Sequence, residues 1–334
     1  GPLPDGVVLE SFADTLQRSA DALEPWLVAD AHQTIFASLN AAFMSDGVHL
    51  RLPRASVLAE PIHAVFVSTA TDAAVHVRNV IVVEDGAQAT IVEHYVGVDD
   101  ATSLTNAVTQ AFVGSNGTLA HYRLQQEASG ALHVGALHAL QQRDSRFASH
   151  SISLGAALAR TDITTRFAAE GCEAELNGLF VAGGRQHVDH HTRIDHAQPH
   201  GTSREYYKGV LDGAARGVFN GKVVVHPGAQ RTDAHLASHN LLLSKTAEID
   251  TKPELTIDAD DVKCAHGASV GQLDPDQLFY LRARGLDAPF ARALLTYAFA
   301  HDVIERVRIA SLRSAVERVL FARLPEGERI RELA

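Results

Sequence analysis

The hydrophobic positions change their period twice along the chain. Between Leu16 and Phe43, apolar residues recur at intervals of three and four, which predicts helices in an N-terminal region that ends at Asp46-Gly47. From Val48 the period falls to two, as in Val75-His76-Val77-Arg78, where alternate side chains are apolar. The pattern therefore predicts a helical region over 1–47 and a β region over 48–272.

Turn signals divide the β region into short strands. They combine a polar residue, Pro or Gly with a small residue and occur at 85–87, 116–118, 144–145, 170–171, 212–213 and 227–228. Their second positions lie 31, 28, 26, 42 and 15 residues apart, which is too irregular for a propeller or a hexapeptide repeat. Almost no helical pattern separates them, so the strands must cover one another, in a sandwich or in a solenoid of stacked coils. Only 6% of the residues are aromatic, and a core of small aliphatic side chains favours the solenoid.

The helical period returns near Gly271. Asp274-Pro275 is an N-cap followed by proline at the first helical position, and Gly285 is placed to end that helix. A second helix is predicted from about 287, and a third segment carries apolar residues on one side between 303 and 320. We therefore expect residues 273–334 to form a helical domain whose apolar stripe is too extensive for the end of the β region to cover.

Charge and cysteine content exclude several classes of protein. The 334 residues include 29 Lys and Arg against 40 Asp and Glu, a net charge of −11, which argues against nucleic acid as a partner. Cys172 and Cys264 are half of what a four-thiolate iron–sulfur site requires, so such a centre would have to be shared or transient. We find no run near the ~20 apolar residues of a membrane span and no signal-peptide pattern, so we expect no membrane association and a cytoplasmic location.

Common catalytic motifs are incomplete. Gly221-Lys222 suggests a phosphate-binding loop, but positions 216 and 223 hold Arg and Val where that motif needs Gly and Ser or Thr. Gly-x-Ser-x-Gly is also missing. The sequence therefore nominates no catalytic residue.

Two groups of residues have metal-binding chemistry. The first is a histidine run at His187, His190, His191, His196 and His200. Because a strand sends adjacent side chains to opposite faces, we favour structural roles for these histidines over a metal site. The second is Cys264-Ala265-His266, where thiol and imidazole share one strand face and offer two ligands that do not by themselves close a site.

Several stretches of the chain resemble the SufD family of the SUF iron–sulfur assembly machinery. The resemblance is densest at KPEL (252–255), ADDVKCAHGA (259–268), VGQLD (270–274) and DQLFYLRARG (276–285), with HNLLL (239–243), HTRIDH (191–196) and DGV (46–48) also similar. Members of the related SufB family typically carry Glu-His-Glu-Ala at the position of Cys264 onward, and a Cys where this chain has Leu281. Both differences favour SufD.

The resemblance implies a right-handed parallel β-helix flanked by helical domains. It also implies a non-catalytic scaffold subunit that binds SufB through the end of the β-helix and the ATPase SufC through the C-terminal helices. An iron–sulfur cluster would form transiently at the SufB interface with His266 as a ligand and Cys264 as a neighbour, while the isolated chain would hold no cofactor.

Three alternatives stay open from the residues alone. A β-helix can belong to a carbohydrate-active enzyme, and a histidine-rich chain can be a metal-binding protein. Self-association into a homodimer also stays open for the isolated chain.

Overall fold

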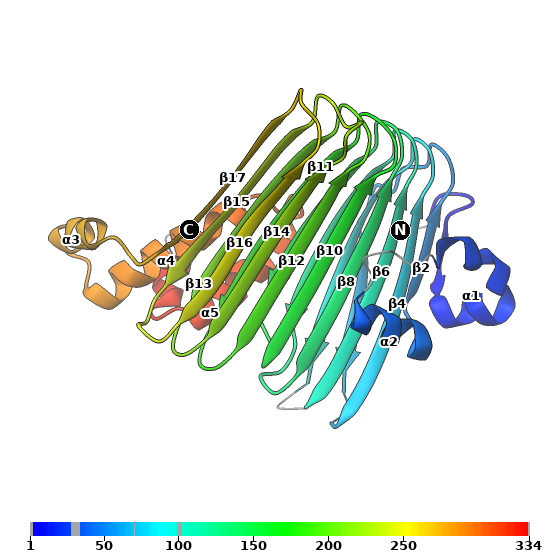
Figure 1. Cartoon of the computed structure of the whole chain (residues 1–334). Coiled ribbons are helices and arrows are strands. Elements are labelled where there is room, and N and C mark those ends of the chain that lie inside the picture. The colour runs from blue at the N-terminus through cyan, green and yellow to red at the C-terminus, as the bar shows by residue number, and fades with distance from the viewer. Residues whose placement is uncertain (1–2, 28–33, 70, 99–101, 333–334) are drawn as a thin grey trace.

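The computed structural model describes residues 3–27, 34–69, 71–98 and 102–332. Its strands stack along one axis in two facing sheets, and helices lie outside them (Figure 1). From β2 onward, successive strands alternate between the sheets, and each pairs in parallel with the strand one coil later. Leu158 pairs with His187 and His187 with Arg216, a step of 29 residues. The predicted parallel β-helix is confirmed.

The strand bounds give the order of the coils. The nine-stranded sheet contains β1 (Val8–Ser11), β2 (Val48–Leu52), β4 (Ala73–Val83), β6 (Ser103–Val113), β8 (Leu132–Gln141), β10 (Leu158–Phe167), β12 (His187–His196), β14 (Arg216–Val225) and β16 (Glu248–Ile257). The eight-stranded sheet contains β3 (Ile62–Ser68), β5 (Gln88–Gly97), β7 (Thr118–Gln126), β9 (Arg146–Ser153), β11 (Glu173–Ala182), β13 (Thr202–Leu211), β15 (Asp233–Leu242) and β17 (Lys263–Gly271).

One corner of the β-helix repeats a left-handed residue in each coil from β4 to β15. Its backbone N–H donates to a carbonyl of the next coil, as from Gly86 to Ser115 at 2.8 Å and from Asn116 to Arg143 at 2.8 Å. The column comprises Gly86, Asn116, Asp144, Gly171, His200 and Arg231. Gly, Asn and Asp tolerate this conformation best, which explains why turn signals were readable here. His200 of the histidine run is therefore a corner residue.

The N-terminal region contains helices, as predicted, and also one strand that the pattern did not predict. β1 pairs antiparallel with β2 and is followed by α1 (Phe12–Arg18), the 3-10 helices Ala20–Ala22 and Glu24–Trp26, and α2 (Ile35–Phe43). A four-residue strand is too short to show a period, so the pattern missed it. Part of the predicted helical stretch, 28–33, lies outside the described residues. Asn40 of α2 donates to the carbonyl oxygens of Val77 and Asn106, which fixes α2 on the nine-stranded sheet.

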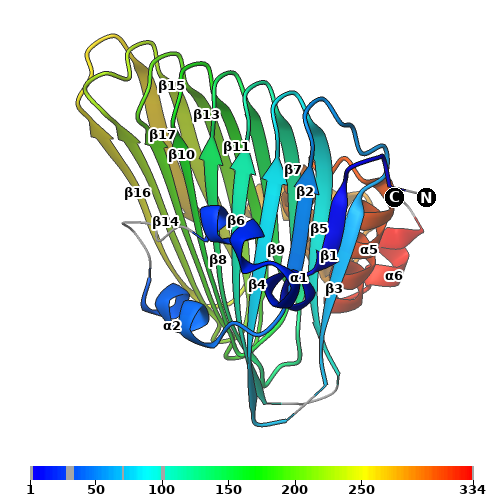
Figure 2. The same ribbon diagram turned by 90° about the vertical axis from the view of Figure 1, so that its right-hand side faces the viewer.

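The C-terminal region contains α3 (Pro275–Ala283), α4 (Ala288–Ile304), α5 (Ala310–Arg323) and α6 (Gly327–Arg331). Asp274 and Asp287 cap α3 and α4, as expected for the first of these. Figure 2 shows α1 and α2 on the side of the nine-stranded sheet and α5 and α6 on the opposite side. None of the helices in the described ranges is long and apolar enough to span a membrane.

Contrary to our expectation, the apolar stripe of the C-terminal helices is already covered within the chain. Side chains of α4 and α5 such as Tyr297 and Leu320 form one buried cluster with Leu124, Ile152 and Leu179 of the eight-stranded sheet. The outer face of that sheet, rather than the end of the β-helix, covers the stripe. By contrast, α3 buries no residue and projects away from the strands (Figure 1).

Glycines inside the β-helix make room for large side chains. A Cβ on Gly178 would overlap the ring of Tyr207, which pairs with it in the neighbouring coil and is fully buried. A Cβ on Gly135 would likewise overlap the guanidinium of Arg123. The interior is close-packed, so these overlaps cannot be relieved by moving one side chain alone.

We expect Gly178→Ala to lower the free energy of unfolding by about 1–3 kcal/mol, because the added methyl overpacks the core against Tyr207. Urea denaturation followed by circular dichroism measures the change. Gly183→Ala is the control, since nothing lies within 4 Å of its Cβ position. Equal stabilities of the two variants would contradict this account of the core.

Candidate functional site

The last strand, β17, lies at the edge of the eight-stranded sheet. Within the described part of the chain it pairs only with β15, with Cys264 opposite Ala234 and His266 opposite Leu236. Ala234 and Leu236 are buried in the main core, so Cys264 and His266 continue rows that line the interior. The predicted pair does share one face, at the open mouth of the β-helix.

The two side chains differ in environment. Cys264 is half-buried and packs against the main core, and this burial raises the pKa of its thiol. His266 is exposed, as is every other residue of β17 apart from Cys264. The thiol is therefore protonated at neutral pH, whereas the imidazole is the more accessible donor.

These two donors alone do not make a metal site. Across the described ranges, no three His, Cys, Asp or Glu residues lie close enough together to hold a metal ion. Cys172 is buried at a corner between β10 and β11, with its sulfur 3.2 Å from the carbonyl oxygens of Gln142 and Ala169. For these two donors to hold a metal, further ligands would have to come from another chain.

Part of the histidine run points inward and is structural. His190 stacks on Phe180 with ring centroids 5.4 Å apart and lies 3.1 Å from the Ser153 hydroxyl. His196 is also buried, 2.9 Å from the hydroxyl of Ser203. Burial lowers the pKa of each imidazole to about 3, so both are neutral at physiological pH.

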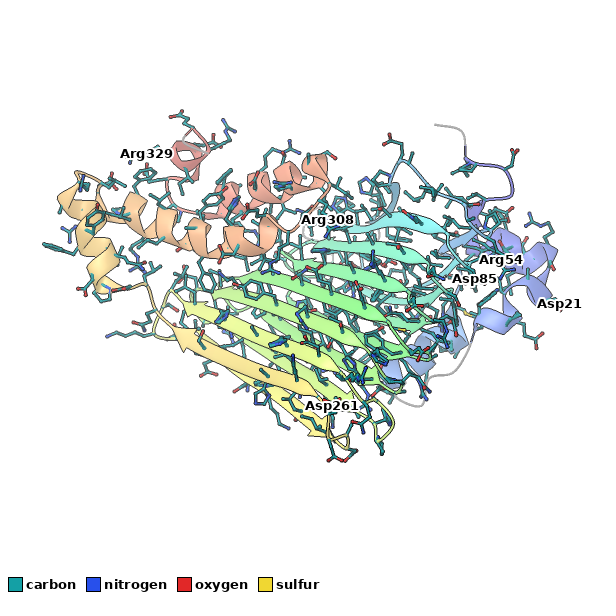
Figure 3. All side chains as sticks on the ribbon, turned by 90° about the horizontal axis from the view of Figure 1, so that it is seen from above. Asp21, Arg54, Asp85, Asp261, Arg308 and Arg329 are labelled. Atoms are coloured by element: carbon teal, nitrogen blue, oxygen red, sulfur yellow. The ribbon has the colours of Figure 1, made fainter. Side chains whose placement is uncertain are left out.

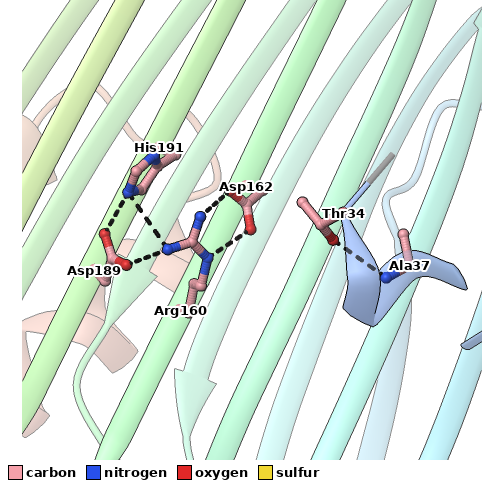
Figure 4. Close-up of polar contacts among 6 residues, drawn as sticks. All are labelled: Thr34, Ala37, Arg160, Asp162, Asp189 and His191. Carbon is pink, nitrogen blue, oxygen red and sulfur yellow. Dashed lines mark hydrogen bonds and ion pairs between the residues drawn. The ribbon is translucent and has the colours of Figure 1, made fainter. Parts of the chain in front are cut away.

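His191, another residue of the histidine run, points outward and pairs with an acidic side chain. His191 is 2.8 Å from Asp189, which together with Asp162 also pairs with Arg160 (Figure 4). This network spans β10 and β12 on the outer face of the nine-stranded sheet. His190 and His191 lie on opposite faces, as expected, so these two imidazoles cannot bind the same ion.

The interior also contains charges that the sequence pattern concealed. Glu93 is 3.4 Å from His121, and Glu127 is 2.7 Å from His133, with all four side chains buried. Burial opposes ionisation of Glu127, but the charge and hydrogen bond of His133 outweigh it and lower the pKa of that carboxyl to about 2. The alternation of side chains along a strand predicts which positions face inward. It does not predict that polar residues such as Glu127 and His133 occupy some of them.

Glu205 is an inward-facing carboxyl that has no charged partner in the described part of the chain. It is buried on β13, its carboxyl oxygens have no hydrogen-bond partner among the residues that the structure describes, and burial raises its pKa to about 7. Because the pKa in the unfolded chain is near 4.5, Glu205 stabilises the fold most below pH 4.5, and this advantage is lost as the pH rises to 7.

We expect Glu205→Gln to remove this pH dependence. Between pH 4.5 and 7.5, the free energy of unfolding of the wild type should fall by up to about 3 kcal/mol relative to the variant. Urea titrations at a series of pH values test this. Glu173→Gln, on an exposed carboxylate, should keep the wild-type profile. If the difference in the free energy of unfolding between the wild type and Glu205→Gln stays constant with pH, Glu205 is ionised in the folded protein over this whole range, which would contradict the account.

The fold and the edge strand define a class: a parallel β-helix protein that presents candidate metal donors on an open edge. A family model described as "SUF system FeS cluster assembly, SufBD core domain" matches residues 66–299. The chain belongs to the SufBD family of iron–sulfur cluster assembly proteins and is SufD-like. The family assignment favours iron–sulfur cluster assembly over the carbohydrate-active and metal-carrier alternatives.

Individual relatives agree. An iron–sulfur cluster assembly SufBD family protein of Synechocystis is 34% identical over 96% of this chain and 73% of its own length. The iron–sulfur cluster assembly protein SufD of Escherichia coli is 33% identical over 88% and 71%, respectively. SufD of Bacillus subtilis is 28% identical over 94% and 73%.

Proposed function

We propose that this chain is a non-catalytic scaffold subunit of a cytoplasmic SUF complex. It binds a SufB-like subunit through β17, contributes a ligand to a nascent iron–sulfur cluster there, and binds a SufC-like ATPase through its C-terminal helices. The observation that carries the proposal is the unpaired, exposed edge of β17 with His266 and Cys264 on its interior face.

The chemistry of the two terminal strands supports docking at β17. In β16, Pro253 lacks an N–H, and four charged residues, Glu248, Asp250, Lys252 and Glu254, discourage pairing with another strand. In β17, Lys263 is the only Lys, Arg, Asp or Glu, and small residues follow it. The edge of β17 can therefore pair with a strand of another chain. A related β-helix that ends in a similar strand is a suitable partner. The same edge can accept a second copy when that partner is missing.

The cluster is cargo in this proposal. Neutral imidazole ligates iron, and His266 stands where the interior rows of the β-helix meet the partner. Cys264 lies two residues away on the same face but is partly covered and holds its proton, so its contribution is smaller. The remaining ligands come from the SufB-like chain, and the isolated chain holds no stable cluster.

Helix α3 supports docking of the ATPase. Phe279 and Tyr280 are 74% and 58% exposed, although neighbouring large aromatic residues on a helix are usually covered. Since α4 and α5 are already packed on the sheet, α3 is the helix of the C-terminal region that buries none of its described residues. ATP binding belongs to the partner, because the phosphate-loop motif is incomplete here.

His266→Ala should leave the complex assembled but reduce cellular iron–sulfur enzyme activity about tenfold or more, because it removes a ligand from an exposed position. Cys264→Ala should have a milder effect, and Ser269→Ala, on the same exposed strand, should have none. Complex formation and enzyme activity are scored in parallel in cells that depend on this pathway. The ligand assignment fails if His266→Ala is fully active or is inactive only because the complex dissociates.

Replacing both Phe279 and Tyr280 with Ser should abolish capture of the SufC-like ATPase while leaving the circular dichroism spectrum and SufB binding intact, since α3 buries nothing within the chain. Ile35→Ser is the matched control, because Ile35 is 81% exposed on the N-terminal helix α2. Unchanged ATPase capture by the double variant would place the contact elsewhere.

A further inference from the structure

A groove of about 750 Å³ crosses the outer face of the eight-stranded sheet. It reaches from β7 to β17, six neighbouring strands and so about 24 Å. Its floor is made of small outward-facing residues: Ala120, Ala148, Ala237, Ala265 and Gly267. The volume lies in the range of small-molecule sites in proteins.

The turn between α4 and α5 forms one wall of this groove. The backbone N–H of Arg308 donates to the hydroxyl of Tyr122 at 3.3 Å, which anchors the turn on the sheet. The guanidinium of Arg306 lies 4.3 Å from the ring centroid of Tyr206. In Figure 3, Arg308 lies where the C-terminal helices meet the strands. The wall is therefore fixed to the sheet at Tyr122 and Tyr206.

Four arginines line the groove, and three of them have acidic partners. Arg146 is 3.2 Å from Glu173, and Arg306 is 3.9 Å from Glu175. Arg204 is 3.0 Å from Asp233. Among the residues that the structure describes, the guanidinium of Arg308 has no hydrogen-bond or ion-pair partner. A chain with a net charge of −11 thus holds an uncompensated cation at this end of the groove.

The groups around Arg308 are hydrogen-bond donors. Tyr122 accepts a hydrogen bond from the backbone, so its own O–H is free to donate. His150 stacks on Tyr122 with ring centroids 4.8 Å apart, and burial lowers the pKa of His150 to about 4. Its imidazole is therefore neutral and adds no charge. The opposing charge of Glu175 is held by Arg306 and by the side-chain amide of Asn177 at 2.8 Å.

We propose that this end of the groove binds the oxyanion group, phosphate or carboxylate, of a small molecule, with the guanidinium groups of Arg306 and Arg308 and the hydroxyl of Tyr122 as donors. The planar guanidinium fork suits both anions, and the apolar floor accepts the remainder of the ligand. The far end of the groove reaches Ala265 and His266 of β17, but the three proposed donors lie outside β17 and α3, so this proposal does not depend on the proposed function.

Calorimetric titration of the purified full chain with pyrophosphate, and separately with citrate, tests the proposal at low ionic strength. We expect saturable binding of at least one anion, and the preferred anion identifies the ligand class. Arg308→Ala should weaken that binding about tenfold or more, and Arg308→Lys by an intermediate factor, because an ammonium keeps the charge but loses the fork.

Arg146→Ala is the matched control. It removes the same charge from the same groove, but Arg146 is paired with Glu173, so binding should change less than about twofold. No saturable binding of either anion would overturn the proposal. Equal weakening by Arg308→Ala and Arg146→Ala would also overturn it, because it would show a diffuse attraction to positive charge.

Discussion

The structure depends on the pairing of each strand with the equivalent strand one coil later. Within the stack this pairing satisfies the backbone, because an inner strand has a neighbour on both sides. The last coil cannot satisfy this requirement. β16 limits further pairing with Pro253 and charged side chains, whereas β17 keeps an exposed, almost uncharged edge. The candidate site lies at β17 because the stack ends there.

Stacking of the coils also constrains which side chains fit in the interior and which elements cover the outer faces. Each inward position repeats from coil to coil, so a large side chain such as Tyr207 needs a small neighbour such as Gly178. Buried charges are tolerated where a partner is in reach, as for Glu127 and His133. On the outside, α4 and α5 cover part of the eight-stranded sheet and leave the groove beside their turn open.

The sequence predicted the β-helix because its two strongest signals, alternation and turns, both survive in the structure. The first four turn signals mark successive coils at one corner, and their spacing of 31, 28 and 26 residues is the length of a coil. The later spacings of 42 and 15 arose because the signal at 212–213 belongs to the opposite corner and the corner at His200 carries no typical turn residue.

Other features required the three-dimensional structure. Periodicity shows that a helix has an apolar stripe but not which surface covers it, so the packing of Tyr297 and Leu320 on the sheet was missed. The shared face of Cys264 and His266 followed from strand geometry. The groove beside Arg308 joins residues nearly two hundred positions apart, such as Tyr122, and no local pattern could reveal it.

The central claim is that β17 is a pairing edge completed by another chain. Hydrogen–deuterium exchange of the chain alone and in complex with its SufB-like partner measures this directly, at the β17 amides that point away from β15. The account predicts fast exchange in the free chain and slowing by about tenfold or more in the complex. Equal exchange rates in the two states would contradict it.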